Sequence, residues 1–228
     1  MKTHIAVSSM VAVLIVSLCI STPAQIVFQD NFTGTTLDTG KWTIQVDTGN
    51  AISQNDMLIS AKATADAAWE NHQLVAVGAW DRASAGIGLV MQCNVKPQNM
   101  ATFVGFIPEG AFSAWSQYTF AFHTSVVNLF TQDFGTNVQN ILSPEAWTTL
   151  RLTCDPTSGG LYEFNTGSGW QTLLDTRGSG DTTARYSLVI DIYHYGDGTQ
   201  QGAYPSVFNV DDLYVGYGTL DVTDWALY

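Results

Sequence analysis

The chain has 228 residues, and a content of 46% hydrophobic and 12% charged residues can build a sizeable core, which excludes a disordered or fibrous protein. It carries 20 Asp and Glu against 8 Lys and Arg, a formal net charge of -12. The sequence contains no cluster of Lys or Arg that could bind a run of phosphate groups, so nucleic acid and anionic membranes are poor partners. The length fits one large domain or two small ones.

Residues 1–24 have the pattern of a secretory signal. An apolar run over 10–20 follows a short polar start, and the small residues Thr22 and Ala24 occupy the -3 and -1 sites. A membrane anchor would instead need about 20 apolar residues followed by a charged stop. We therefore expect a cleaved signal, export to the periplasm or the extracellular space without a membrane anchor, and one mature domain over 25–228.

Export decides how the cysteines are interpreted. Cys19 leaves with the signal, so Cys93 and Cys154 remain, and two cysteines in an oxidising compartment favour a disulfide. Apolar residues alternate in phase with Cys93 over 87–95 and in phase with Cys154 over 150–154, which predicts both thiols on the core side. We expect a Cys93–Cys154 disulfide, and the alternative is two buried, unpaired cysteines.

Period-two alternation recurs along the mature chain and predicts an almost entirely β protein. Short polar turns separate the strands, and no linker or internal repeat divides them, which is typical of one antiparallel sandwich. Residues 61–70 favour helix by composition but are too short for a stable one, so we interpret them as a loop or a single turn. The predicted strands are 26–32, 41–47, 52–60, 72–79, 86–95, 101–107, 117–123, 125–132, 147–154, 160–165, 169–174, 185–193 and 206–217.

Four short motifs carry a resemblance to a known superfamily. Residues 28–42 read Phe-Gln-Asp-Asn-Phe-Thr-Gly-Thr-Thr-Leu-Asp-Thr-Gly-Lys-Trp, and related strand motifs follow at 55–60, 147–152 and 210–216. Together they resemble the concanavalin A-like lectin/glucanase superfamily. The resemblance implies an all-β fold, a jelly-roll β-sandwich of two antiparallel sheets, whose concave face binds or cleaves glycans.

The catalytic motif of the superfamily's glucanases is absent. Those enzymes carry Glu-x-Asp-x-Glu on one strand, whereas the four glutamates of this chain are dispersed. Asp191 and His194 are the weak catalytic candidates, and Asp191 would need a second carboxylate from another strand to act in a glycoside hydrolase. A polysaccharide lyase, with His194 beside Arg185 or Arg82, is a further alternative, but an acidic chain repels polyanionic substrates.

Aromatic residues in polar surroundings are the candidates for sugar contact, because a ring can stack on a pyranose while neighbouring polar groups hydrogen-bond it. Trp42 and Trp147 are assigned to the core instead. We expect a secreted, lectin-like, non-catalytic module for a neutral polysaccharide or glycan, and the third alternative is an adhesive or structural domain. The predicted ligand-binding residues are Trp80, Trp115, Asp191, Tyr193, His194 and Tyr195.

Two further features lie near the chain ends. The resemblance implies a structural Ca²⁺ held by Asp30 with Asp211 or Asp212, since the first and last strands of a jelly roll are neighbours. The alternative is that these aspartates hydrogen-bond nearby backbone. Residues 31–33, Asn-Phe-Thr, form an N-glycosylation sequon that is meaningful if the source is eukaryotic.

Overall fold

A computed structural model shows an all-β protein with two antiparallel sheets, as predicted. Within the part of the chain that it describes, no helix is long and apolar enough to cross a membrane. The described residues are 24–46, 51–62, 69–70, 72–99, 101–111, 118–123, 128–131, 137–138, 146–195 and 206–218.

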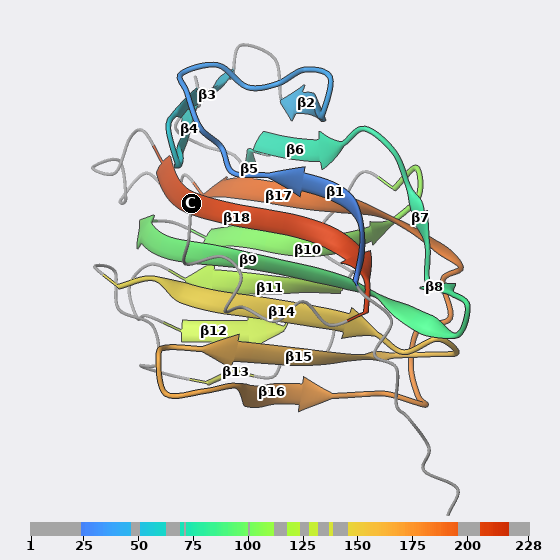
Figure 1. Cartoon of the computed structure of the whole chain (residues 1–228). Coiled ribbons are helices and arrows are strands. Elements are labelled where there is room, and N and C mark those ends of the chain that lie inside the picture. Colours follow the sequence, from blue (N-terminus) through green and yellow to red (C-terminus); the bar gives the residue numbers. More distant parts are fainter. Residues whose placement is uncertain are drawn as a thin grey trace, which may run out of the picture.

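The first sheet contains both the first and the last strand (Figure 1). β1 (Gln25–Asp30) pairs with β18 (Ser206–Tyr217), and β8 (Ala83–Ser84) pairs with β9. The main order is β16 (Gln171–Asp175), β15 (Gly160–Asn165), β14 (Thr148–Cys154), β9 (Ile87–Asn99), β18, β4 (Leu58–Lys62) and β3 (Ala51–Asn55).

The second sheet lies behind the first in Figure 1 and has β17 near its centre. β5 (Trp69–Glu70) and β7 (Trp80–Asp81) pair with β17 near its two ends. The main order is β13 (Asn137–Val138), β12 (Asn128–Thr131), β11 (Tyr118–His123), β10 (Ala101–Pro108), β17 (Arg185–Tyr195), β6 (His72–Ala76) and β2 (Trp42–Val46).

The predicted strands correspond closely to these elements, with two instructive differences. The predicted strand 52–60 is a hairpin, β3–β4, which turns at Asp56, a residue with φ of 47°. Asp tolerates this left-handed conformation better than most residues. Part of the predicted loop 61–70 is strand, because β4 runs to Lys62 and Trp69–Glu70 form β5.

The core lies between the sheets and contains residues from both. Trp42 is buried there as predicted, with its ring 5.2 Å from that of Phe28 and 5.6 Å from that of Phe32. The core assignment of Trp147 is wrong, since this side chain is 41% exposed. Thr148, the first residue of β14, is buried, so alternation turns the preceding side chain outward.

The predicted disulfide is also wrong, because Cys93 and Cys154 are both free and buried. Both thiols do belong to the core, as the alternation predicts. However, Cys93 is registered opposite Leu150, four residues before Cys154 on β14. Four residues of strand span about 13 Å, and a disulfide needs Cα atoms within about 7 Å.

The side chain of Arg82 links the turn between β14 and β15, in the first sheet, to the segment that precedes β17, in the second sheet. It is 5% exposed and its guanidinium lies 5.3 Å from the centre of the Tyr186 ring on β17. Its N–H groups donate at 2.7–2.9 Å to the carbonyls of Asp155, Gly159, Asp181 and Thr183 and to the Asp181 carboxylate, and also to the Tyr186 hydroxyl.

We predict that Arg82→Ala lowers the free energy of unfolding by about 3 to 5 kcal/mol, because it removes the cation that pairs with Asp181 and one hydrogen-bond donor from each of four backbone carbonyls. Urea unfolding followed by tryptophan fluorescence measures the change. Arg177→Ala is the control, since Arg177 forms an exposed ion pair with Asp175 and should change little. Equal midpoints for the two variants would contradict the role of Arg82.

We predict that Cys93 and Cys154 resist alkylation at pH 8 in the native protein and react fully after unfolding. Burial raises the pKa of both thiols, to about 12 for Cys154, so the reactive thiolate is scarce in the folded state. Mass spectrometry of the non-reduced protein after alkylation with and without urea measures the labelling. Failure of both cysteines to react in urea without reductant would show a disulfide.

Candidate functional site

The outer face of the second sheet carries a buried carboxylate. On β17, Leu188, Ile190 and Ile192 point into the main core, so Val189 and Asp191 face the opposite side. The Asp191 side chain is fully buried. Strand β17 therefore places one acidic group on the sheet face that lies away from the core.

Neighbouring strands surround Asp191 with an amide and an aromatic ring. Gln73 on β6 and Phe103 on β10 are registered directly opposite Asp191, and Gln45 on β2 is opposite Gln73. The Gln73 Nε2 donates a hydrogen bond of 2.9 Å to the Asp191 Oδ2. The Oε1 atoms of Gln73 and Gln45 are buried acceptors without a hydrogen bond in the described part of the chain. In this polar row of Asp191, Gln73 and Gln45, two amide oxygens thus have no donor among the described residues.

An apolar cluster adjoins the polar row. Phe103, Ile107 and Val189 are buried together, and Val75 and Ala111 pack against them. Fully buried residues cannot touch a sugar directly in this conformation.

The end of β17 is aromatic. Its register pairs Tyr195 with Trp69, His194 with Glu70 and Tyr193 with Ala101. Trp69, Tyr193 and Tyr195 stand at ladder positions in phase with Asp191, which in a regular strand belong to one face. The sequence interpretation missed Trp69, because it treated residues 61–70 as a loop.

The other predicted aromatic contacts do not join this strand end. Trp80 is registered opposite Tyr186, five residues or about 16 Å along β17 from Asp191. Its ring lies 5.7 Å from that of Phe28 and packs against the main core, so it has a packing role. Trp115 lies outside the described residues.

The described strands of the second sheet do not provide a pair of facing carboxylates. Glu70 occupies a ladder position out of phase with Asp191, since it is registered opposite His194. Glu109 is exposed and forms an ion pair with Arg185, and Glu163 belongs to the first sheet, where it binds Arg151. None of these three glutamates is thus registered beside Asp191 on its face of the sheet, and the fourth, Glu145, lies outside the described residues.

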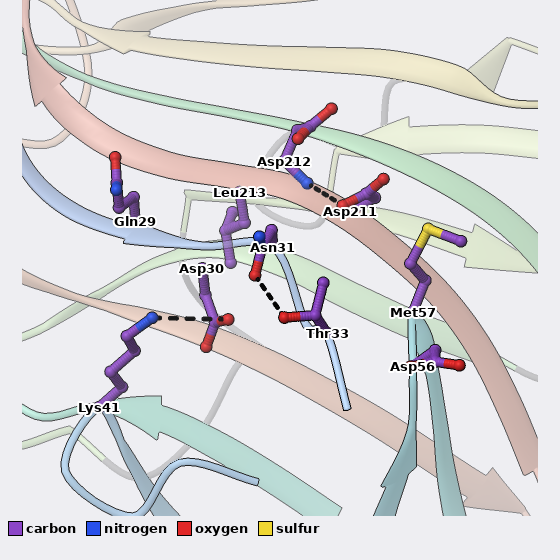
Figure 2. A pocket seen from close by; sticks show the side chains of 10 residues that line it. All are labelled: Gln29, Asp30, Asn31, Thr33, Lys41, Asp56, Met57, Asp211, Asp212 and Leu213. Carbon is purple, nitrogen blue, oxygen red and sulfur yellow. Dashed lines mark hydrogen bonds and ion pairs between the residues drawn. The ribbon is translucent and has the colours of Figure 1, made fainter. Parts of the chain in front are cut away.

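A cavity of about 790 Å³ lies where β1 meets β18, at the predicted calcium site (Figure 2). Asp30 accepts hydrogen bonds of 2.9 Å from the Phe32 amide and 2.7 Å from the Trp42 indole, and the Lys41 Nζ is 3.7 Å away. Its oxygens thus serve N–H donors and a lysine, which does not fit a calcium ligand. The backbone alternative predicted for Asp30 is partly confirmed by the Phe32 contact.

Asp211 and Asp212 line the same cavity, but Figure 2 shows their side chains directed away from Asp30. Asp212 lies at a bulge with φ of 47°, its amide donates to the Asp211 Oδ1 at 2.8 Å, and it accepts from Asn94 at 3.1 Å. Burial raises the pKa of both carboxyls. No group of three or more His, Cys, Asp or Glu among the described residues could hold a metal ion.

Comparison with known proteins identifies the fold. No protein-family profile and no curated protein matches the sequence. Solved structures do match, among them SCLam, a non-specific endo-β-1,3(4)-glucanase from family GH16, with a TM-score of 0.55 and 13% identity over 86% of this chain and 92% of that one.

Two other matches illustrate the range of this fold. Lectin II from Ulex europaeus gives a TM-score of 0.53 and 10% identity over 85% of this chain and 100% of the lectin. An immunostimulatory antigen and pseudo β-1,3-glucanase of Mycobacterium tuberculosis gives 0.51 and 13% over 86% and 100%. The protein has the concanavalin A-like lectin/glucanase fold.

The calcium prediction can be tested with Asp212→Asn. Burial raises the pKa of Asp212 in the folded state above its value in the unfolded state. The contribution of this carboxyl to the free energy of unfolding therefore falls as the pH rises from the unfolded-state pKa to the folded-state pKa, and it stays low at higher pH. The amide variant removes that charge, and Asn also tolerates φ of 47°. We therefore predict a higher thermal midpoint for the variant than for the wild type in EDTA at pH 7.

Millimolar calcium separates the two roles of Asp212. An ion that binds only the folded state raises the wild-type midpoint, and the variant that lacks the carboxylate ligand responds less. Identical wild-type melting curves in EDTA and in calcium would show that Asp211 and Asp212 hold no structural calcium.

Proposed function

We propose that this protein is an exported glycan-binding module without hydrolytic activity. The fold, which lectins and glucanases share, supports binding of carbohydrate, but it does not distinguish a protein that only binds from one that also cleaves. The observation that carries the proposal is the β17 ladder. It combines one buried carboxylate, Asp191, with three aromatic ladder positions in the same phase, Trp69, Tyr193 and Tyr195.

Each part of this strand has its own role in the proposal. The rings of Trp69 and Tyr195, at the strand end, stack on the apolar face of a pyranose. Asp191 acts as a positioning residue, because its carboxylate is buried and holds the amide of Gln73. The Oε1 atoms of Gln73 and Gln45 are buried, so they do not reach a ligand in this conformation, and the aromatic positions at the strand end carry the contact in this proposal.

Charge supports a neutral ligand. With a formal charge of -12, the chain repels uronate-containing or sulfated polysaccharides at long range. The same argument disfavours a polysaccharide lyase. The dispersed glutamates, in place of the Glu-x-Asp-x-Glu strand of the superfamily's glucanases, disfavour a glycoside hydrolase of that type, whose two carboxylates lie about 5 to 9.5 Å apart.

We predict that Trp69→Ala weakens binding to a neutral oligosaccharide at least about tenfold, as loss of a central aromatic contact typically does. A glycan array first identifies the ligand, and calorimetry then measures the affinity. Trp147→Ala is the matched control, since it removes an exposed tryptophan beside the other sheet and should leave the affinity unchanged. Thermal melting checks that both variants fold.

Three results would count against the proposal. The absence of any wild-type glycan binding would favour an adhesive or structural domain. Release of reducing ends from β-glucans, lost in Asp191→Asn, would show a hydrolase. Equal affinity of Trp69→Ala and wild type would move the binding site away from the end of β17.

A further inference from the structure

The turn that follows β1 contains Asn31-Phe32-Thr33, and no other Asn-x-Ser/Thr triplet occurs in the chain. Such a triplet is the acceptor sequence for asparagine-linked oligosaccharide. Whether an acceptor asparagine can carry a sugar in the folded protein depends on its exposure and on the space around it. Both can be read directly from this turn.

The conformation of the turn separates the middle residue from its neighbours. Phe32 has φ of 48° and its side chain is buried, with its ring stacked 5.6 Å from that of Trp42. Asn31 and Thr33, on either side of it, are both exposed. The buried ring therefore anchors the triplet while its two polar side chains stay accessible.

The two exposed side chains contact one another (Figure 2). The Thr33 hydroxyl donates a hydrogen bond of 3.2 Å to the Oδ1 of Asn31. This contact uses the carboxamide oxygen of Asn31. It leaves the Nδ2, the atom to which a sugar is attached, available for modification.

The surroundings offer a firm support and open space. The Gln54 amide donates at 2.8 to 3.2 Å to the carbonyls of Phe32, Thr33 and Gly34, which fixes the turn against β3. Asn31 also lines the cavity of about 790 Å³ beside Asp211 and Asp212. Asn31 therefore borders open space, and an uncharged sugar attached there adds no negative charge beside the two aspartates.

We propose that Asn31 is an N-glycosylation site in a eukaryotic secretory pathway, a modification that goes beyond the proposed glycan-binding function. The co-reactant is a polyprenyl-pyrophosphate-linked oligosaccharide. The Nδ2 of Asn31 forms a bond to the sugar C1, the bond from C1 to the pyrophosphate oxygen breaks, the pyrophosphate leaves with the bonding electrons, and one amide proton passes to a base of the transferase.

The test is secretion of the full chain from cultured eukaryotic cells with an added N-terminal endoplasmic reticulum signal, so that routing does not limit the result. We expect a wild-type protein whose mass falls on treatment with a peptide N-glycosidase, and peptide mass spectrometry that finds the removed sugar at position 31. Asn31→Gln and Thr33→Ala both abolish the shift, and Thr33→Ser retains it in part.

Asn55→Gln is the matched control, because Asn55 is exposed and lies outside any sequon. This variant keeps the full mass shift. An unmodified Asn31 in secreted wild-type protein would overturn the proposal, as would a shift that survives in Asn31→Gln. Neither result depends on whether the protein binds glycans at β17.

Discussion

The alignment of the two sheets depends on the hydrogen bonds that the buried guanidinium of Arg82 donates. Through Asp155 and Gly159 it holds the turn between β14 and β15, which belong to the first sheet. Through Asp181 and Tyr186 it holds the start of β17, a strand near the centre of the second sheet. One charged side chain thus fixes how β17 sits relative to the neighbouring sheet, and β17 carries the candidate site. Because so many acceptors depend on it, substitution by an uncharged residue cannot satisfy them all.

A second constraint acts at the same turn. Gly159 has φ of 70°, and a Cβ at this residue would lie 1.9 Å from the Thr176 carbonyl oxygen and 2.2 Å from that of Ser179. The backbone approaches so closely there that no side chain fits. The turn needs this glycine so that the Gly159 carbonyl can accept the hydrogen bond from Arg82. A side chain at residue 159 would push the turn away and break that hydrogen bond.

Alternation along strands was sufficient to predict the sheets and the facing of most core residues, because a period of two reports directly which side of a strand is buried. Cys93 and Cys154 show its limit. Facing was predicted correctly for both, but position along the strand depends on the register between β9 and β14, which no local pattern encodes. Trp147 was assigned wrongly for another reason: the alternation that buries Thr148 and Leu150 turns residue 147 outward, whereas the core assignment followed residue type.

The candidate site was predictable to the extent that it lies on one strand. The run Tyr193–Tyr195 and Asp191 were recognised from sequence because they are contiguous. Trp69 was not, since its relation to Tyr195 arises from pairing of segments more than a hundred residues apart. Asp30 was assigned to a metal because its sequence position fits that role, whereas its actual partners, Lys41 and the Trp42 indole, come from a later strand and its preceding turn.

The central claim is that the end of β17, with β5 beside it, binds a neutral glycan. The most direct measurement is an NMR titration of isotope-labelled protein with the oligosaccharide that binds it best, following backbone amides. The account predicts that the largest shift changes cluster at Trp69–Glu70 and Tyr193–Tyr195 and extend to Gln73. Changes confined to the cavity between β1 and β18, or to the outer face of the first sheet, would contradict it.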